Sequence, residues 1–411
     1  MRTLALDVAR YEPIKLRVSD LRVGMFVCEI DRPWSETPFP PTGFALRNDA
    51  DIEEAKRHCD YVYIDLGRTR MVRVKIDEFP RQAFIGDAQH SSLEQEMRRA
   101  EAAKNETSNV INNFLDDIRL GHSVDLGLAQ GAVSQCVASA LRNPDALLLL
   151  ARMQEKNPQI AEHAFNACIY SIILGRLQGF EAQQLEVLGL SGLLHDIGHI
   201  EIPDAILNKT GTLNEEEFAL IKQHTRLGRD ILLAADGIHT DAAEVAYGHH
   251  ECPDGSGYPQ GLKSSQISLN CRIVAVVDKY EAITRNTPYR TAQSHLDAVH
   301  LLNLLADSGK IDKPLCASFV SYLGFYPPGT IVELSSGEVA IVLKSHAKNR
   351  LRPLLLIVRD AQNNPVERIV DLAVATPDGN GKPRKIKMVH LPGYRGIDLS
   401  RYQSALIHAY D

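Results

Sequence analysis

The stretch Leu193-Leu194-His195-Asp196-Ile197-Gly198-His199 decides how the middle of the chain folds. His195 stands seven residues after Leu188, so it shares the apolar face of a helix. Asp196 is carried inward with it, and a buried carboxylate needs a partner because an isolated buried charge is costly. Apolar residues recur at helical spacing from about Val133 to Leu304, with Gly, Pro or Asn between the runs. This pattern predicts an all-α central domain.

Histidines concentrate in this region. Seven of the 15 histidines fall within less than a quarter of the chain, at positions 163, 195, 199, 224, 239, 249 and 250. His163 shares a helical face with Ile160 and Ala167, so it also points inward. A single inward histidine is usually a hydrogen-bonded core residue. The adjacent pairs His195-Asp196 and His249-His250, together with His224 at the expected start of a helix, instead form a set.

Metal binding accounts for such a set, because imidazoles and carboxylates that are costly to bury separately match the N/O coordination of a divalent transition metal. The candidate ligands are His163, His195, Asp196, His224, His249, His250 and Asp278. Seven candidates exceed the usual number for one ion, and Asp196 can bridge with its two oxygens. We therefore expect two ions, one held by His163, His195 and Asp278 and the other by His224, His249 and His250. Fe, Mn, Co, Ni and Zn all suit these ligands.

Longer motifs in the same region closely resemble the HD-GYP family. The motifs are His195–Gly198, His224–Gly228, His249–Glu251, Asp254–Leu262 with its Gly257-Tyr258-Pro259, Arg272–Asp278 and Pro288–Arg290. The resemblance covers roughly Gln159 to Tyr322. It implies an all-α HD-type phosphodiesterase that hydrolyses cyclic di-GMP, with metal ligands at the seven positions named.

The resemblance also implies a mechanism, in which a hydroxide bridging the two metals attacks the phosphorus and gives linear pGpG, with further cleavage to GMP left open. Asp196 and His199 are the expected catalytic residues. Two alternatives remain at this stage: a catalytically weak cyclic di-GMP receptor or signalling interaction protein, and an HD phosphohydrolase that acts on another nucleotide. Turnover by the metal-loaded protein separates them.

Four positions depart from the family pattern. His199 replaces a lysine and is expected to act as a phosphate-side donor whose charge varies near pH 6–7. Glu281 replaces an aspartate, and Thr287 replaces an arginine. Gln159 stands where members with a third metal carry a glutamate, and a neutral amide is a poor ligand, so two metals are expected rather than three.

Four further residues are candidates for substrate binding: Arg290, Lys263, Tyr258 and Arg285. Arg290 can pair with a phosphate, although a surface arginine fits nearly as well. Lys263 is more often a solvated lysine. Tyr258 can stack on a base or on a partner domain, or simply complete a rigid turn. GGDEF-type signalling proteins are a candidate partner for the Gly257-Tyr258-Pro259 loop, and a homodimer is also open.

The flanking regions differ from the helical centre. We expect an α+β domain for regulation or docking at 1–80, a linker with a connecting helix at 81–132, the all-α HD-GYP domain at 133–323 and a β-rich appendage at 324–411. The segment from Ile14 to about Asp65 resembles a domain of unknown function that often precedes HD-GYP domains in bacteria. The expected fold is thus multidomain, with an all-α catalytic domain between two small domains.

Composition excludes several classes of protein. The 411 residues are 44% hydrophobic and 24% charged, which is typical of a globular protein. A net charge of −7 gives no positive field for a nucleic-acid polymer. Apolar runs are too short to span a membrane, and the N-terminus lacks a signal-peptide pattern. Seven scattered cysteines do not form a disulfide framework. A cytoplasmic protein is expected.

Overall fold

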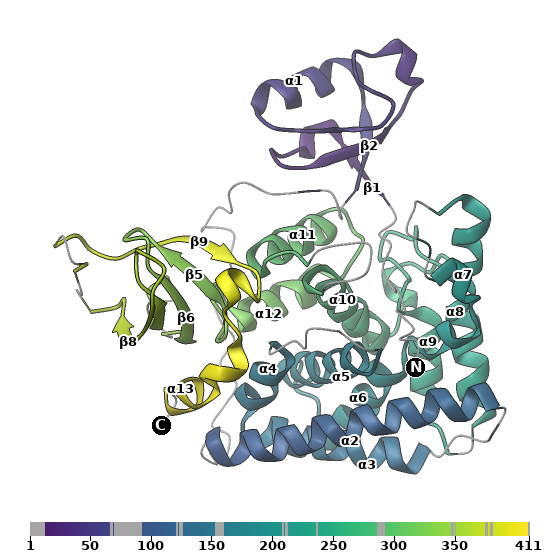
Figure 1. The fold of residues 1–411 in the computed structure, drawn as a ribbon. Coiled ribbons are helices and arrows are strands. Elements are labelled where there is room, and N and C mark those ends of the chain that lie inside the picture. The colour runs from purple at the N-terminus through teal and green to yellow at the C-terminus, as the bar shows by residue number, and fades with distance from the viewer. Residues whose placement is uncertain are drawn as a thin grey trace.

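The computed structural model describes residues 13–65, 69, 93–120, 122, 126–152, 160–207, 209, 213–235, 237–285, 292–346, 349, 351–374, 377–378 and 381–409. A helical domain occupies the centre, with a small α+β unit at the N-terminal end and a β-sheet unit at the C-terminal end (Figure 1). The expected fold class is therefore confirmed. None of the described helices is both long and apolar enough to cross a membrane.

The helical domain is built from the following helices: α2 (Leu93–Leu120), α3 (Leu126–Arg142), α4 (Pro144–Arg152), α5 (Ile160–Leu177), α6 (Ala182–Leu194), the 3₁₀ helix η4 (Ile197–Glu201), α7 (Asp204–Leu207), α8 (Glu215–Ala234), α9 (Thr240–Gly248), α10 (Leu269–Thr284), α11 (His295–Asp307) and α12 (Lys313–Leu323). Helix α5 is buried along most of its length, and α6 and α10 pack against it. These central helices carry most of the candidate ligands.

Helix α2 lies within the helical core instead of forming a separate linker. Its buried face includes Met97, Ala103 and Phe114, which belong to the same hydrophobic cluster as α3 and α5. The boundary expected at residue 133 falls inside α3. The sequence pattern hid this packing because the buried face of α2 includes Glu96 and Thr107 among its apolar residues, and Glu, Lys and Arg surround it.

Helix α8 also begins earlier than the sequence suggested. The Asn214 side chain accepts a hydrogen bond from the Glu217 backbone N–H at 2.8 Å, and the Glu217 side chain accepts one from the Asn214 N–H at 2.8 Å. This reciprocal cap starts the helix at Glu215. His224 therefore lies in the middle of α8, and the expectation that it opens a helix was wrong.

The N-terminal unit is a four-stranded antiparallel sheet with one helix. Its elements are β1 (Ile14–Arg17), η1 (Val18–Asp20), β2 (Phe26–Ile30), η2 (Trp34–Glu36), β3 (Phe44–Ala45), α1 (Asp49–His58) and β4 (Tyr61–Ile64), and the strand order is β1-β4-β2-β3. Asn48 caps α1 by accepting from the Asp51 N–H at 3.0 Å. The sheet and helix bury Met25, Val62 and Ile64 between them.

The C-terminal unit is a five-stranded antiparallel sheet in the order β8-β7-β6-β5-β9. The strands are β5 (Ile331–Leu334), β6 (Val339–Lys344), β7 (Leu354–Arg359), β8 (Pro365–Asp371) and β9 (Ile386–His390), followed by η6 (Tyr394–Gly396), η7 (Leu399–Tyr402) and α13 (Gln403–His408). Ile331 and Ile341 pair across β5 and β6 and join the core of the helical domain, whereas Val332 and Ala340 face a separate core of the sheet. The sheet thus buries both faces.

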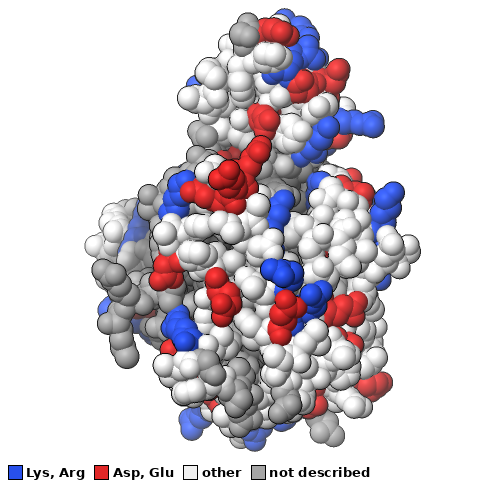
Figure 2. Space-filling model, turned by 90° about the vertical axis from the view of Figure 1, so that its right-hand side faces the viewer, with Lys and Arg blue, Asp and Glu red and all other residues white. Residues whose placement is uncertain are grey.

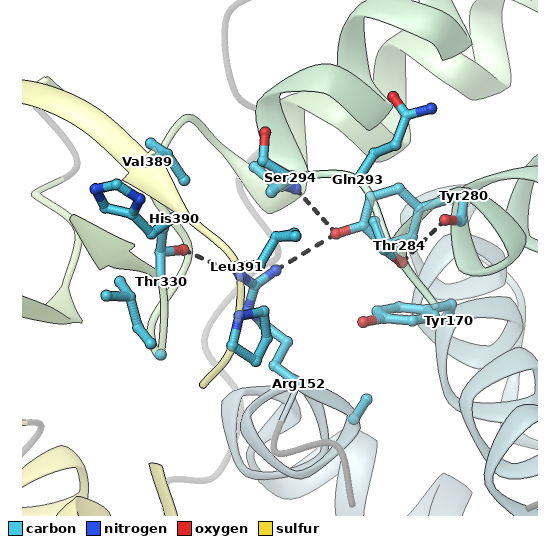
Figure 3. Close-up of a pocket in the computed structure, with 15 residues that line it drawn as sticks. Arg152, Tyr170, Tyr280, Thr284, Gln293, Ser294, Thr330, Val389, His390 and Leu391 are labelled. Carbon is cyan, nitrogen blue, oxygen red and sulfur yellow. Dashed lines mark hydrogen bonds between the residues drawn. The ribbon is translucent and has the colours of Figure 1, made fainter. Parts of the chain in front are cut away.

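Arg152, at the end of α4, joins this sheet unit to the helical domain (Figure 3). Its guanidinium donates to the Pro328 carbonyl and to Thr330 Oγ1, each at 3.0 Å, and contacts the Tyr280 hydroxyl at 3.4 Å. That hydroxyl lies 2.9 Å from His295 Nδ1. Burial lowers the pKa of His295 to about 3, so its ring is neutral there. The network fixes α10 against the sheet unit.

Charged side chains of both signs are interspersed on the face drawn in Figure 2, with no broad basic surface there. This distribution agrees with the net charge of −7. A polyanionic duplex would need a continuous basic stripe.

Candidate metal centre

The structure brings all seven candidate ligands together in the interior of the helical domain. His163 comes from α5, His224 from α8 and Asp278 from α10, while His195-Asp196 and His249-His250 directly follow α6 and α9. None of the seven is more than 9% exposed. The site is therefore assembled from residues that lie on or directly after five helices, α5, α6, α8, α9 and α10 (Figure 1).

These side chains form two groups that share Asp196. One group is Asp196, His224, His249 and His250, and the other is His163, His195, Asp196 and Asp278. Within each group, one potential ligand atom per residue lies within 4.8 Å of all the others. Such groups of neutral imidazoles and carboxylates fit divalent metal ions.

The two oxygens of Asp196 face different groups. Oδ2 lies 3.1 Å from Nε2 of both His163 and His195. Oδ1 lies 3.6 Å from His224 Nε2 and 3.4 Å from His249 Nε2. This is the arrangement that a carboxylate bridging two ions requires.

Backbone carbonyls orient several of the rings. Nδ1 of His195 donates to the Gly192 carbonyl at 2.8 Å, and Nδ1 of His224 donates to the Ile221 carbonyl at 2.8 Å. His249 makes the same contact with Val245 at 3.0 Å. Because Nδ1 carries the proton, the Nε2 lone pair points into the site, as metal ligation needs.

Close backbone packing holds Asp196 beside α8. A Cβ atom at Gly198 would lie 2.0 Å from the His224 carbonyl oxygen, so only glycine lets η4 approach α8 this closely. The Gly198 position thus fixes the distance between Asp196 and His224.

Several atoms of the site are buried without a hydrogen-bond partner. Among the residues described, they include His195 Nε2, Asp196 Oδ1 and Asp278 Oδ1. Buried polar atoms are normally satisfied, so three orphans that converge on one place indicate a missing ligand. A metal ion bound at each group would satisfy them.

The ionisation of these groups agrees with metal binding. Burial, reinforced by neighbouring imidazoles, holds the pKa of both His224 and His250 well below the usual value, so both rings are neutral. Burial opposes ionisation of Asp196, but the adjacent His195 outweighs it and keeps the pKa of Asp196 well below its usual value. His224, His250 and Asp196 are therefore in the forms that coordinate a metal, whereas the carboxylates of Asp196 and Asp278 outweigh burial and raise the pKa of His195 to about 10.

Glu281 supports His163 from behind. Its Oε2 lies 2.5 Å from His163 Nδ1, and its carboxylate also pairs with Arg285 at 3.4 Å. A carboxylate that accepts from the second nitrogen of a ligand histidine fixes the ring and makes it a stronger ligand. From the sequence, Glu281 was noted only as a departure from the family pattern. Its spacing of three residues from Asp278, on one face of α10, was the available signal.

His199 lies at the edge of the site. It is fully buried, its ring stacks on His224 at 4.0 Å, and its Nε2 is 3.6 Å from Asp196 Oδ1. Both ring nitrogens lack a hydrogen-bond partner among the described residues. Burial lowers the pKa of His199 to about 4. The expectation of a charge that varies near pH 6–7 was therefore wrong, because a desolvated imidazole stays neutral.

The residues expected to contact the substrate differ in how deeply they are buried. Tyr258 is half-buried, and its ring stacks on His250 at 4.7 Å. Lys263 is exposed, whereas Arg285 is buried against Glu281. Arg290 lies outside the described residues, as do Thr287 and Gln159.

Comparison with known proteins agrees with this architecture. A family model of the HD domain matches residues 150–315, and a model of a domain of unknown function, DUF3391, matches residues 13–129. A cyclic di-GMP phosphodiesterase of Pseudomonas aeruginosa is 32% identical over 378 residues, which cover 88% of this chain and 89% of that protein. This chain belongs to the HD-GYP family. As a member with an HD domain, it is a hydrolase.

Two other relatives match this HD-GYP protein over a shorter range. A cyclic di-GMP phosphodiesterase of Thermotoga maritima is 45% identical over 122 residues, covering 29% of this chain and 33% of that protein. A 3'3'-cGAMP-specific phosphodiesterase of Vibrio cholerae is 33% identical over 167 residues, covering 41% and 38% of the two chains. The relatives of this HD-GYP protein are thus named for different substrates, cyclic di-GMP in one case and 3'3'-cGAMP in the other.

Proposed function

We propose that this HD-GYP protein hydrolyses a phosphodiester bond of cyclic di-GMP at a dinuclear metal centre. The position of Asp196 carries the proposal, because its two oxygens face two separate groups of ligands. The P. aeruginosa relative, which matches nearly the whole chain, is named for this activity. The complete set of ligands favours turnover over a receptor that only binds the nucleotide.

The chain would hold one ion with His163, His195 and Asp278 and the other with His224, His249 and His250, with Asp196 shared. When bound, the ions supply a deprotonated water as nucleophile and offset the negative charge that develops on the phosphate. The surrounding residues orient the ligands: backbone carbonyls accept from Nδ1 of His195 and His224, and Glu281 accepts from Nδ1 of His163. Burial of the ligands excludes competing bulk water.

Product analysis on anaerobically purified protein tests the proposal directly. Gln159 stands where family members with a third metal carry a glutamate, and a neutral amide is a poor ligand. We therefore expect at most two metals per chain and accumulation of linear pGpG. The linear product carries an extra terminal-phosphate charge that two metals must also accommodate. Gln159→Glu should add a third metal and speed release of GMP. Three metals in the unaltered chain, or GMP without a linear intermediate in a single turnover, would contradict this proposal.

We assign His199 the role of a neutral donor to a phosphate oxygen, because its two buried nitrogens have no partner among the described side chains. His199→Ala should lower kcat about 100-fold while bound metal stays constant. His199→Lys restores the family residue and should recover part of that loss. Metal analysis and steady-state kinetics check both variants. Loss of metal from His199→Ala would instead make His199 a ligand.

The Gly257-Tyr258-Pro259 loop is the proposed contact for a GGDEF-type protein. Tyr258 is half-buried on His250, and Pro259 beside it is exposed, so the loop presents a surface next to the metal centre. Pull-down with a purified GGDEF domain tests this contact, and sedimentation of the full chain tests a homodimer.

A further inference from the structure

A cavity of about 310 Å³ opens between the end of α2 and the segment from η4 to the start of α7. Leu115 and Ile202, each at most 5% exposed, form apolar walls together with Ile160. Its volume lies at the lower end of the roughly 300–1,000 Å³ typical of small-molecule sites. Polar side chains complete the lining, and a cavity of this size with apolar residues beside polar ones suits a single heteroaromatic ring system.

This cavity adjoins the metal centre. His199 lines it, and its Nε2 is 3.6 Å from Asp196 Oδ1. Leu115 and Ile160 also line a second cavity of about 20 Å³ that holds His163 and Asp196. A nucleotide with its phosphate at the metals could therefore place a base between α2 and η4.

The rim carries charges of both signs. Arg119 of α2 forms an exposed ion pair with Asp116 at 3.3 Å, which is weak enough to exchange for a ligand. Glu201, the last residue of η4, is exposed, and its carboxylate makes no hydrogen bond or ion pair within the described part of the chain. Asp204 also lines the rim and takes part in another interaction of the chain.

Guanine matches this combination better than adenine. Its Watson–Crick edge offers N1–H and N2–H donors to a carboxylate, and its O6 and N7 accept from an arginine. Adenine presents an acceptor at N1, which repels a carboxylate, and a donor at N6, which opposes a guanidinium. A carboxylate and a guanidinium at the same rim thus favour guanine over adenine, because the carboxylate suits the N1–H and N2–H donors and the guanidinium suits the O6 and N7 acceptors.

We propose that this cavity is the subsite for one base of the cyclic dinucleotide, and that Glu201 and Arg119 select guanine there. The inference rests on the proposed function and deepens it by naming residues that determine specificity. Neither residue contacts the metal ligands, so the choice of base and the cleavage of phosphate are separable.

Steady-state kinetics of Glu201→Gln on cyclic di-GMP and cyclic di-AMP test the proposal. We expect KM for cyclic di-GMP to rise about 10-fold, since a hydrogen bond to a charged group is lost. The ratio of kcat/KM for cyclic di-AMP over cyclic di-GMP should rise by at least as much, because an amide can pair with adenine. The exposed Glu216→Gln of α8 is the matched control and should change neither value.

A substrate without a base separates the subsite from the chemistry. Hydrolysis of bis(p-nitrophenyl) phosphate should be equal in the unaltered protein and in Glu201→Gln. An equal loss on every substrate, or no difference between Glu201→Gln and Glu216→Gln, would overturn the assignment.

The subsite and the proposed function can fail separately. If the protein cleaves bis(p-nitrophenyl) phosphate but not cyclic di-GMP, the proposed function fails. Equilibrium binding of GMP and AMP then judges the subsite alone: tighter binding of GMP that Glu201→Gln abolishes supports it, and equal binding contradicts it.

Discussion

Asp196→Ala should abolish both metal retention and hydrolysis. Its Oδ2 faces His163 and His195, and its Oδ1 faces His224 and His249, so one substitution removes a ligand from both groups. We expect cyclic di-GMP hydrolysis to fall by at least about 10³-fold, since several kcal/mol of transition-state stabilisation depend on the ions. Metal analysis should find well under one ion per chain.

The control is Asp230→Ala, which removes an exposed carboxylate of α8 that pairs with Arg229. That variant should keep its metals and its rate. Circular dichroism should show that both variants keep their helices, since the helical domain rests on large hydrophobic clusters that both variants leave unchanged. Retained hydrolysis in Asp196→Ala would falsify the dinuclear mechanism.

The candidate ligands could be named from sequence because of an energetic constraint. Histidine and aspartate are rarely carried on apolar helix faces, and a buried carboxylate must find a partner. The neighbouring pairs His195-Asp196 and His249-His250 made that constraint visible along the chain. Likewise, the β-rich appendage expected at 324–411 is confirmed, because the described residues there form a sheet of five strands.

Features that depend on tertiary contact could not be predicted in this way. Arg119 and Glu201 are 82 positions apart and share a cavity only because α2 packs beside η4. His199 was expected to titrate near neutrality, but that depends on desolvation by surrounding helices, which local sequence does not report. The same holds for α2, whose polar composition concealed a buried apolar face.

Glu281→Ala should weaken metal binding at the His163 group without removing a ligand. Glu281 Oε2 lies 2.5 Å from His163 Nδ1, so its loss frees the ring to rotate and lowers its basicity. We expect about a 10- to 100-fold loss of affinity for one ion, as is usual when a ligand histidine loses its carboxylate. Competition with a chelator measures this affinity, and the second ion should be held as before.

If Glu281 positions His163 and is not itself a catalytic residue, added metal should restore the activity of Glu281→Ala. At saturating metal, kcat of Glu281→Ala should return to within a few-fold of the unaltered rate, whereas loss of a catalytic group could not be rescued by metal. Arg285 must be considered as well, because it is buried and pairs with Glu281 at 3.4 Å. Glu281→Ala leaves that guanidinium without its carboxylate, and an unpaired buried charge destabilises the fold.

The double variant Glu281→Ala/Arg285→Met therefore separates the two effects. It removes the stranded charge while His163 still lacks its support, so its thermal stability should recover but its metal affinity should not. Glu281→Asp keeps a carboxylate on a shorter side chain and should lose less affinity than Glu281→Ala. If chelator competition finds full affinity in the double variant, the hydrogen bond to His163 has no part in holding the metal, and Glu281 serves only to neutralise Arg285.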